Sequence, residues 1–147
     1  MNKKQKNLTN KGFSLVELII VIAIMAVLVG VLAPQFIKYV EQSRKSTDIQ
    51  NAENIKTAVL ADIADGKITG KNTNPGGDKF TDSMTTSITT APTPAGSYKN
   101  NKVDGFYVIY DATAGTCSVV VKDSAASSTK TYTLTDPTEA ANYKEEK

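Results

Sequence analysis

The sequence has no histidine, no tryptophan and a single cysteine, Cys117. The lack of histidine removes the commonest general base and the commonest metal ligand of proteins. One cysteine allows neither a disulfide within the chain nor a metal site built from several thiolates. The sequence also contains no phosphate-binding Walker loop and no catalytic triad. We therefore predict a protein that is not an enzyme and that needs no cofactor and no metal.

The net positive charge of the chain comes from its amino terminus. The chain has 17 basic and 15 acidic residues, a net charge of +2. Four basic residues and no acidic residue precede Gly12: Lys3, Lys4, Lys6 and Lys11. The rest of the chain carries 13 basic against 15 acidic residues, a net charge of −2. A sequence-independent nucleic-acid binder needs a clustered basic face, and the charge pattern provides none.

Large apolar side chains are scarce after Ala33 and concentrated before it. Residues 13–33 are apolar except for Ser14 and Glu17. A helix of this length would extend about 31 Å, close to the roughly 30 Å hydrocarbon core of a bilayer. The run is longer than the apolar core of a signal peptide, contains an acid and lacks an Ala-x-Ala exit. Because lysines precede it closely, we predict a single-pass cytoplasmic membrane protein with its amino terminus in the cytoplasm.

A second helical pattern follows the apolar run. Apolar residues recur every three or four positions and predict one buried stripe: Ile49, Ala52, Ile55, Val59 and Ile63. Gly66 is a plausible end of this helix. Pro34 would then lie inside one long helix and kink it, because proline lacks an N–H and crowds the preceding turn.

The remaining residues predict a small antiparallel sheet. Residues 70–101 are rich in Gly, Pro, Thr, Ser and Asn and predict a long loop. Three strands follow at 106–110, 116–121 and 131–134, and the tail after Asp136 is expected to be loose. The fold class is α+β, with a long bent helix packed on the sheet. The predicted segments are a leader (1–12), an apolar half-helix (13–33), a soluble half-helix (34–66) and a globular domain (67–147).

Several polar residues of the outer part have competing interpretations. Four aspartates lie in or near predicted loops: Asp78, Asp82, Asp104 and Asp111. Calcium ligation by them is conceivable, but EF-hand spacing is absent, so solvated loop acids are favoured. Cys117 falls in a predicted strand, where we expect a small buried apolar side chain rather than a nucleophile. The tyrosines are expected to pack in the core or on strands.

The segment KGFSLVELIIVIAI, residues 11–24, resembles the amino terminus of type IV prepilins and the related pseudopilins. The resemblance implies that a membrane aspartyl peptidase cuts between Gly12 and Phe13 and methylates the new amine of Phe13. Pro34 also matches a proline of the family's long helix. The remainder is similar in layout only, most closely to the clostridial-type pilins of Gram-positive bacteria. The implied fold is type IV pilin-like, with the first half of the helix in the membrane or the fibre core.

Glu17 is costly in an apolar span and needs a reason to be there. A carboxylate costs roughly 2.5–3.5 kcal/mol near the bilayer centre and less near its edge. One interpretation places Glu17 hydrated at the interface. The other pairs it with the new amine of Phe13, since two unpaired charges in a dry fibre would be costly. The two residues lie four apart, on one helical face. The resemblance implies that the pairing is with the amine of the next subunit.

Four small residues line another face of the apolar helix: Ala23, Ala26, Gly30 and Ala33. Such faces allow close helix packing where lipid provides no hydrophobic driving force, although small residues are common in membrane helices generally. Gly30 and Pro34 together mark the weakest stretch of the helix and predict a kink or local melting there.

The resemblance implies a structural subunit that polymerises with itself into a surface fibre for adhesion, twitching motility or biofilm formation. A minor pilin or a pseudopilin for secretion or DNA uptake is the alternative. A membrane-anchored binding or enzyme domain is a third reading, disfavoured by the lack of catalytic groups. The implied partners are the prepilin peptidase, an assembly platform with its ATPase, and the membrane before assembly. The fibre itself would be extracellular.

Overall fold

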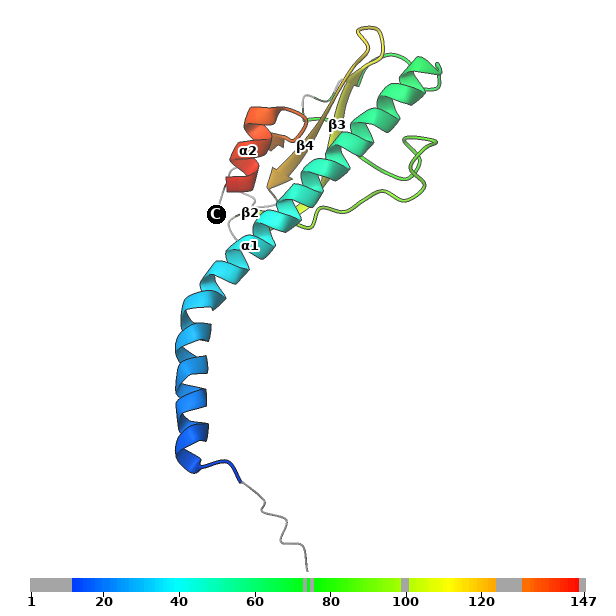
Figure 1. Ribbon diagram of the computed structural model, residues 1–147. Helices are drawn as coiled ribbons and strands as arrows, with labels where there is room; N and C mark the ends of the chain where they lie inside the picture. Colours follow the sequence, from blue (N-terminus) through cyan, green and yellow to red (C-terminus); the bar gives the residue numbers. More distant parts are fainter. Residues whose placement is uncertain (1–11, 73, 75, 99–100, 124–130, 146–147) are drawn as a thin grey trace, which may run out of the picture. The chain divides into compact units, whose positions relative to one another are not determined.

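The computed structural model describes residues 12–72, 74, 76–98, 101–123 and 131–145 (Figure 1). The chain forms two compact units, one ending at Lys38 and the other beginning at Tyr39. Helix α1, Leu15–Ala64, is one continuous 50-residue element. It has Pro34 inside it. Because proline has no N–H, the Gly30 carbonyl lacks its usual partner four residues on.

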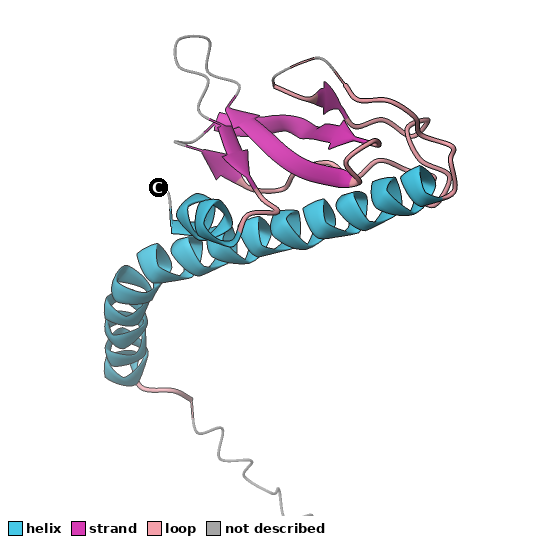
Figure 2. Cartoon of the chain, turned by 90° about the horizontal axis from the view of Figure 1, so that it is seen from above, coloured by secondary structure: helices cyan, strands magenta, loops and turns pink. Residues whose placement is uncertain are grey.

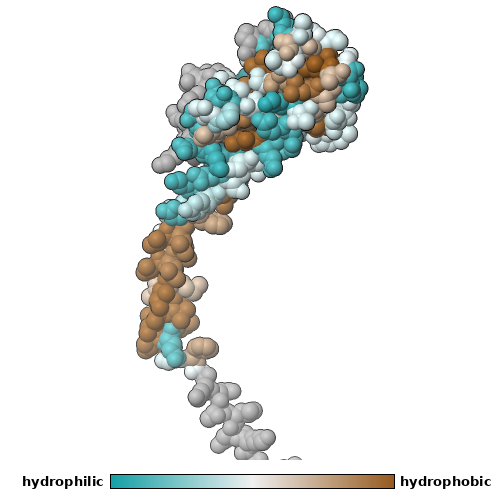
Figure 3. All heavy atoms as spheres, turned by 45° about the horizontal axis from the view of Figure 1, so that its top comes forward, coloured by the Kyte–Doolittle hydropathy of each residue, from teal (hydrophilic) through white to brown (hydrophobic). Residues whose placement is uncertain are grey.

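The described residues of the first unit, 12–38, are all exposed, and they are helical from Leu15 on. An 18-residue window of α1 has a mean hydropathy of 3.1 and no residue buried in the structure. By length and composition, α1 is therefore apolar enough to cross a membrane. The face seen in Figure 3 is apolar over most of this half of the helix, with a hydrophilic patch near the amino-terminal end.

The second unit packs the outer half of α1 along one face of an antiparallel sheet (Figure 2). The strands are β1 (Asp78–Lys79), β2 (Ser97–Tyr98), β3 (Asn101–Asp111), β4 (Thr116–Asp123) and β5 (Thr131–Thr133). They run in the order β1-β3-β4-β5, and β2 also pairs with β3. The predicted α+β layout and its three strands, which correspond to β3, β4 and β5, are confirmed.

The β3–β4 turn follows from local chemistry. Asp111 Oδ1 accepts hydrogen bonds from the backbone N–H groups of Thr113 and Ala114, at 2.9 and 3.0 Å. Gly115 completes the turn with a φ of 66°, which glycine adopts without strain. Val108 then lies opposite Val119, and β-branched pairs of this kind stabilise a sheet.

The core lies between α1 and the sheet. The predicted helix stripe supplies its centre, with Ala52, Ile55 and Val59 almost completely buried and Ile49 and Ile63 packed at the edges. The sheet contributes Phe106, Val108, Val119, Val121 and Tyr132. Cys117 is half-buried beside this core. Burial is the main cause that raises the pKa of its thiol to about 11, so it is a thiol at neutral pH.

The expectation of a loose tail after Asp136 is wrong. Residues Pro137–Glu145 form helix α2. Asp136 caps it, because its Oδ1 accepts from the backbone N–H groups of Thr138 and Glu139 at 2.9 and 3.0 Å. Proline at the first helical position is a known start signal. Ala140 and Tyr143, three residues apart on α2, are both buried in the core. The Asp-Pro-x-Glu pattern predicts this helix, but the polar composition of the tail favoured the expectation that it has no regular structure.

The long loop that precedes β3 is held by carboxylates of α1. Glu41 Oε1 accepts from the Ser97 N–H at 2.6 Å. Asp62 accepts from the N–H and the hydroxyl of Thr86, both at 2.7 Å. These hydrogen bonds cause the pKa of Asp62 to lie below its usual value. A loop with little regular structure therefore has fixed attachment points on the helix.

A third carboxylate, Asp48, is fully buried at the junction of α1, the loop and α2. Its Oδ1 accepts from the Ala95 N–H at 2.7 Å, and its Oδ2 accepts from the Gly96 N–H at 2.8 Å and the Tyr143 hydroxyl at 2.9 Å. A Cβ at Gly96 would lie 2.6 Å from the Tyr143 oxygen, so only glycine fits there. The buried Lys45 Nζ lies 5.2 Å from the centroid of the Tyr143 ring.

Candidate functional site

The amino-terminal end of α1 holds the residues that the sequence singled out for processing. Residues 12–14 are not helical, and α1 begins at Leu15. The Phe13 side chain is 92% exposed. No atom lies within 4 Å of a Cβ built on Gly12. The bond between Gly12 and Phe13 thus lies in an accessible segment directly before the helix. The leader lysines fall outside the described residues.

Glu17 and Ser14 form a reciprocal cap on the helix. The Ser14 backbone N–H donates to Glu17 Oε2 at 2.8 Å, and the Leu18 N–H donates to the Ser14 carbonyl at 3.2 Å. This is the acidic half of a capping box, in which the third helical residue reaches back to the N-cap. The carboxylate also lies at the positive end of the helix dipole. The Ser-x-x-Glu spacing predicts this bond, and the sequence reasoning missed it.

The cap leaves Glu17 with capacity for a second partner. A carboxylate has two oxygens and about four acceptor positions, and the Ser14 N–H takes one of them. The amine at Phe13 that we expect to pair with Glu17 exists only after cleavage, so the uncut chain does not contain that contact. Glu17 is exposed in the single chain.

The small-residue face lies further along the same unit. Ala23, Ala26, Gly30 and Ala33 are all exposed. No atom lies within 4 Å of a Cβ built on Gly30. None of the residues that the structure describes covers this face, and its use for helix packing stays a prediction.

The aspartates weighed as calcium ligands have other partners. Asp82 accepts from the Ala91 N–H at 2.6 Å. Asp104 accepts from Lys79 at 3.2 Å and from the Tyr107 hydroxyl at 2.8 Å. The Tyr107 hydrogen bond is the main cause that lowers the pKa of Asp104. Within the described ranges, no group of three or more His, Cys, Asp or Glu side chains could hold a metal ion.

Comparisons with known proteins agree with the amino-terminal geometry. Residues 8–33 match the family model "Prokaryotic N-terminal methylation motif". A type IV major fimbrial protein FimA of Dichelobacter nodosus is 36% identical over 61 residues, which cover 42% of this chain and 39% of the relative. A fimbrial protein of the same organism is 28% identical over 109 residues, which cover 71% of this chain and 59% of the relative.

The family-model match covers residues 8–33, which include the start of α1. The chain spans between 39% and 59% of the length of these two relatives. No solved structure gives a significant match to the chain. The outer sheet and α2 consequently rest on the structure itself rather than on a solved relative.

Proposed function

We propose that this chain is a pilin subunit of a type IV pilus, a function that its methylation motif and its fimbrial relatives support. It would be a bulk subunit, which polymerises into a surface fibre. The apolar helix fits a membrane-anchored pilin that ends in an extracellular fibre. Adhesion, surface motility or biofilm formation would be the uses of that fibre. Its partners would be other copies of the chain, a prepilin peptidase, and an assembly platform with its ATPase.

The observation that carries this proposal is the uncovered first half of α1. Fifteen large apolar side chains between Phe13 and Leu32 are each at least 51% exposed. Burial of one such side chain is worth about 1.5–3 kcal/mol, so this surface must be covered. A bilayer can cover it before assembly, and the helices of neighbouring subunits can cover it afterwards.

Hydrophobic burial alone does not favour the fibre over the membrane. Lipid tails are as apolar as leucine, so moving the helix from lipid to a fibre core gains little from this effect. Close packing and polar contacts must supply the difference. The small face of Ala23, Ala26, Gly30 and Ala33 would allow close packing, and Glu17 would supply the polar contact.

In this scheme the peptidase cuts between Gly12 and Phe13, and the Phe13 amine is methylated. The amine is then a cation at the start of an apolar helix. Glu17 of a neighbouring subunit would neutralise it while keeping the bond to its own Ser14 N–H. Because the amine and the carboxylate lie four residues apart in each chain, with Phe13 two residues before α1 begins, pairing between chains would set the axial stagger.

Glu17→Gln separates the two roles of this carboxylate. Glutamine can still accept from the Ser14 N–H, since a capping box uses either Glu or Gln, but it has no charge for the amine. Breaking a buried ion pair typically costs about 3–5 kcal/mol. That cost recurs in every subunit. We therefore expect strains with Glu17→Gln or Glu17→Ala to lose most surface fibres, as counted by electron microscopy of sheared material.

The matched control is Glu53→Ala, which removes an exposed glutamate of the same helix with a surface contact of 3.6 Å to Lys56. This variant should keep normal fibres, because exposed ion pairs contribute little. Normal fibres with Glu17→Gln but not with Glu17→Ala would show that only the cap matters. Normal fibres with both would show that Glu17 is a tolerated interfacial acid.

A further inference from the structure

The edge of β3 that faces away from β4 is covered by short pieces of chain rather than by a full strand. On the β4 side, β3 is paired from Val103 to Asp111. On the other side, β1 and β2 contribute two residues each, and the Phe80 N–H donates to the Phe106 carbonyl at 2.8 Å. Because β1 reaches only as far as Val108, the ladder beyond that residue needs another partner.

Asn72 continues this ladder with its side chain. Its Nδ2 donates to the Val108 carbonyl at 2.6 Å, and its Oδ1 accepts from the Tyr110 N–H at 3.0 Å. The Asn72 backbone N–H donates to the Tyr110 carbonyl at 3.2 Å, and the Gly70 carbonyl accepts from the Ala112 N–H at 2.7 Å. A carboxamide offers the same kinds of donor and acceptor as a peptide group, so this side chain replaces a residue of a missing strand.

Glycine allows the next part of the chain to lie directly on β3. Gly77 has a φ of 74°, and a Cβ built there would lie 2.8 Å from the Val108 carbonyl oxygen. Asn74 holds this turn, because its Nδ2 donates to the Gly77 carbonyl at 2.9 Å and its Oδ1 accepts from the Gly76 N–H at 3.1 Å. Residues 70–72, 74 and 76–80 thus form an edge cover that contains little regular strand.

The strand beneath the edge cover is suited to pairing with a further strand. Residues 106–110, FYVIY, are all aromatic or β-branched, and they include no charge and no proline. Segments of this composition form sheets between chains when their edge is open. We propose that this edge of β3 is a latent pairing surface for the same edge of a second copy, and that Asn72 and Gly77 keep it closed.

The geometry of the edge fits a second copy of the chain. Val108 and Tyr110 each direct backbone groups toward the edge cover, as their bonds to Asn72 show. Two identical edges can pair antiparallel about a twofold axis, because each then offers the donors and acceptors that the other needs. Such pairing would join copies through their sheets rather than through the apolar half of α1. The proposal concerns the outer domain alone and does not depend on fibre assembly.

A pair of glycine substitutions tests the edge cover in the full chain, purified in detergent micelles. Gly77→Ala places a methyl group against β3. Gly115→Ala is the matched control, because Gly115 has a similar φ of 66° but no atom within 4 Å of its Cβ. Both variants therefore introduce left-handed backbone strain, and only Gly77→Ala displaces the cover. We expect light scattering to show protein dimers or larger species for Gly77→Ala at concentrations where Gly115→Ala and the wild type keep one mass.

Hydrogen exchange tests the same edge at high dilution, where copies do not meet. The Tyr110 amide of the wild type should exchange slowly, and Asn72→Ala should accelerate it by at least about tenfold through local opening. Asn54→Ala, which alters an exposed asparagine of α1, should leave this amide unchanged. Asn72→Ala should also associate when it is concentrated, as Gly77→Ala does.

Three results would overturn the proposal. Fast exchange of the Tyr110 amide in the wild type would show that the edge is already open. Folded variants with a fast Tyr110 amide that keep the wild-type mass at every concentration would show that the open edge does not pair. Equal association of Gly77→Ala and Gly115→Ala would assign the effect to backbone strain instead of the edge.

Discussion

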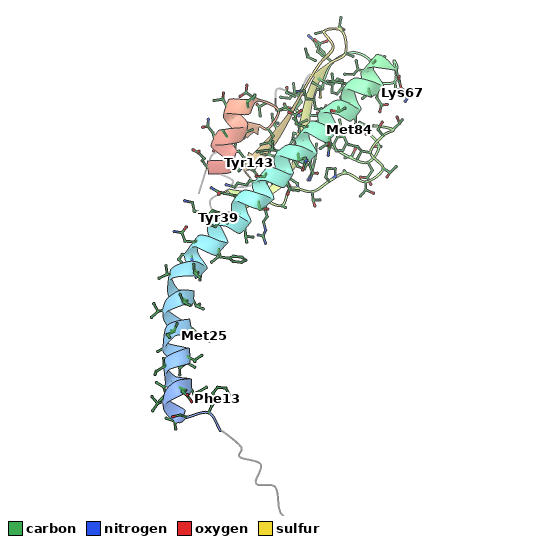
Figure 4. The ribbon with its side chains drawn as sticks, viewed as in Figure 1. Phe13, Met25, Tyr39, Lys67, Met84 and Tyr143 are labelled. Carbon is green, nitrogen blue, oxygen red and sulfur yellow. The ribbon has the colours of Figure 1, made fainter. Side chains whose placement is uncertain are left out.

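Replacing Tyr143 with phenylalanine should destabilise the outer domain through one hydrogen bond. Tyr143 lies on α2, beside α1 (Figure 4), and is fully buried. Its hydroxyl donates to Asp48 Oδ2 at 2.9 Å. Its ring lies 5.6 Å from the ring of Tyr132, centroid to centroid. Phenylalanine keeps the ring and removes only the hydroxyl, so the change isolates the hydrogen bond from the packing.

The expected loss is about 1.5–3 kcal/mol, the usual contribution of a hydrogen bond to a charged group. Asp48 would still accept from the N–H groups of Ala95 and Gly96, so the carboxylate is not left without partners and the cost should not reach that of an orphaned buried charge. Against a total stability of roughly 5–15 kcal/mol, the loss is large enough to measure.

The assay is urea unfolding of residues 35–147, followed by circular dichroism, for the wild type and the variant. The midpoint should fall with little change in the denaturant slope. Tyr39→Phe is the matched control, because Tyr39 is 66% exposed and surface changes are usually within about 0.5 kcal/mol. Equal effects of the two substitutions would refute the docking of α2 on Asp48.

Alkaline pH gives an independent check of the same contact. Burial first, and then the Asp48 carboxylate, raise the pKa of Tyr143 above the usual value of about 10 for a tyrosine. Above that value the unfolded chain releases the Tyr143 proton and the folded chain keeps it, so the unfolded state gains stability. The free energy of unfolding should then fall by up to about 1.4 kcal/mol per pH unit from this residue. Tyr143→Phe should lose this part of the slope, so its disadvantage should shrink as pH rises above 10.

Four further results are expected. The intact mass of assembled protein should correspond to a chain that starts at a methylated Phe13, and a chain that retains residues 1–12 or starts after Ala33 would contradict this. Reductant should leave the melting temperature of monomeric residues 35–147 unchanged, because Cys117 has no partner cysteine. The free energy of unfolding should fall in acid, beginning below about pH 4 and continuing until the pH passes the lowered pKa of Asp62, because the unfolded chain protonates Asp62 at a higher pH than the folded chain does. Asp62→Asn should weaken this acid dependence. A fibre map should show the helix melted between Gly30 and Pro34, and a continuous helix there would contradict us.

Much of the molecule follows from local pattern. The apolar run, the stripe of Ile55 and its neighbours, and the strand pairs around Val108 are periodic features, and periodicity depends only on residues close together in the chain. The amino-terminal motif was equally visible, since processing acts on a short continuous segment. The cap between Ser14 and Glu17 was predictable from its spacing as well, although the apolar setting drew attention to charge alone.

Contacts between distant segments were decided by the tertiary structure alone. The sequence shows Asp48 as one more charge on a helix, but the fold buries it against Gly96 and Tyr143, which are 48 and 95 residues away. Burial makes that carboxylate an attachment point, because a buried charge requires partners that water no longer supplies. The tail became a helix for the same reason: α2 is marginal alone, and the docking of Tyr143 into the core stabilises it.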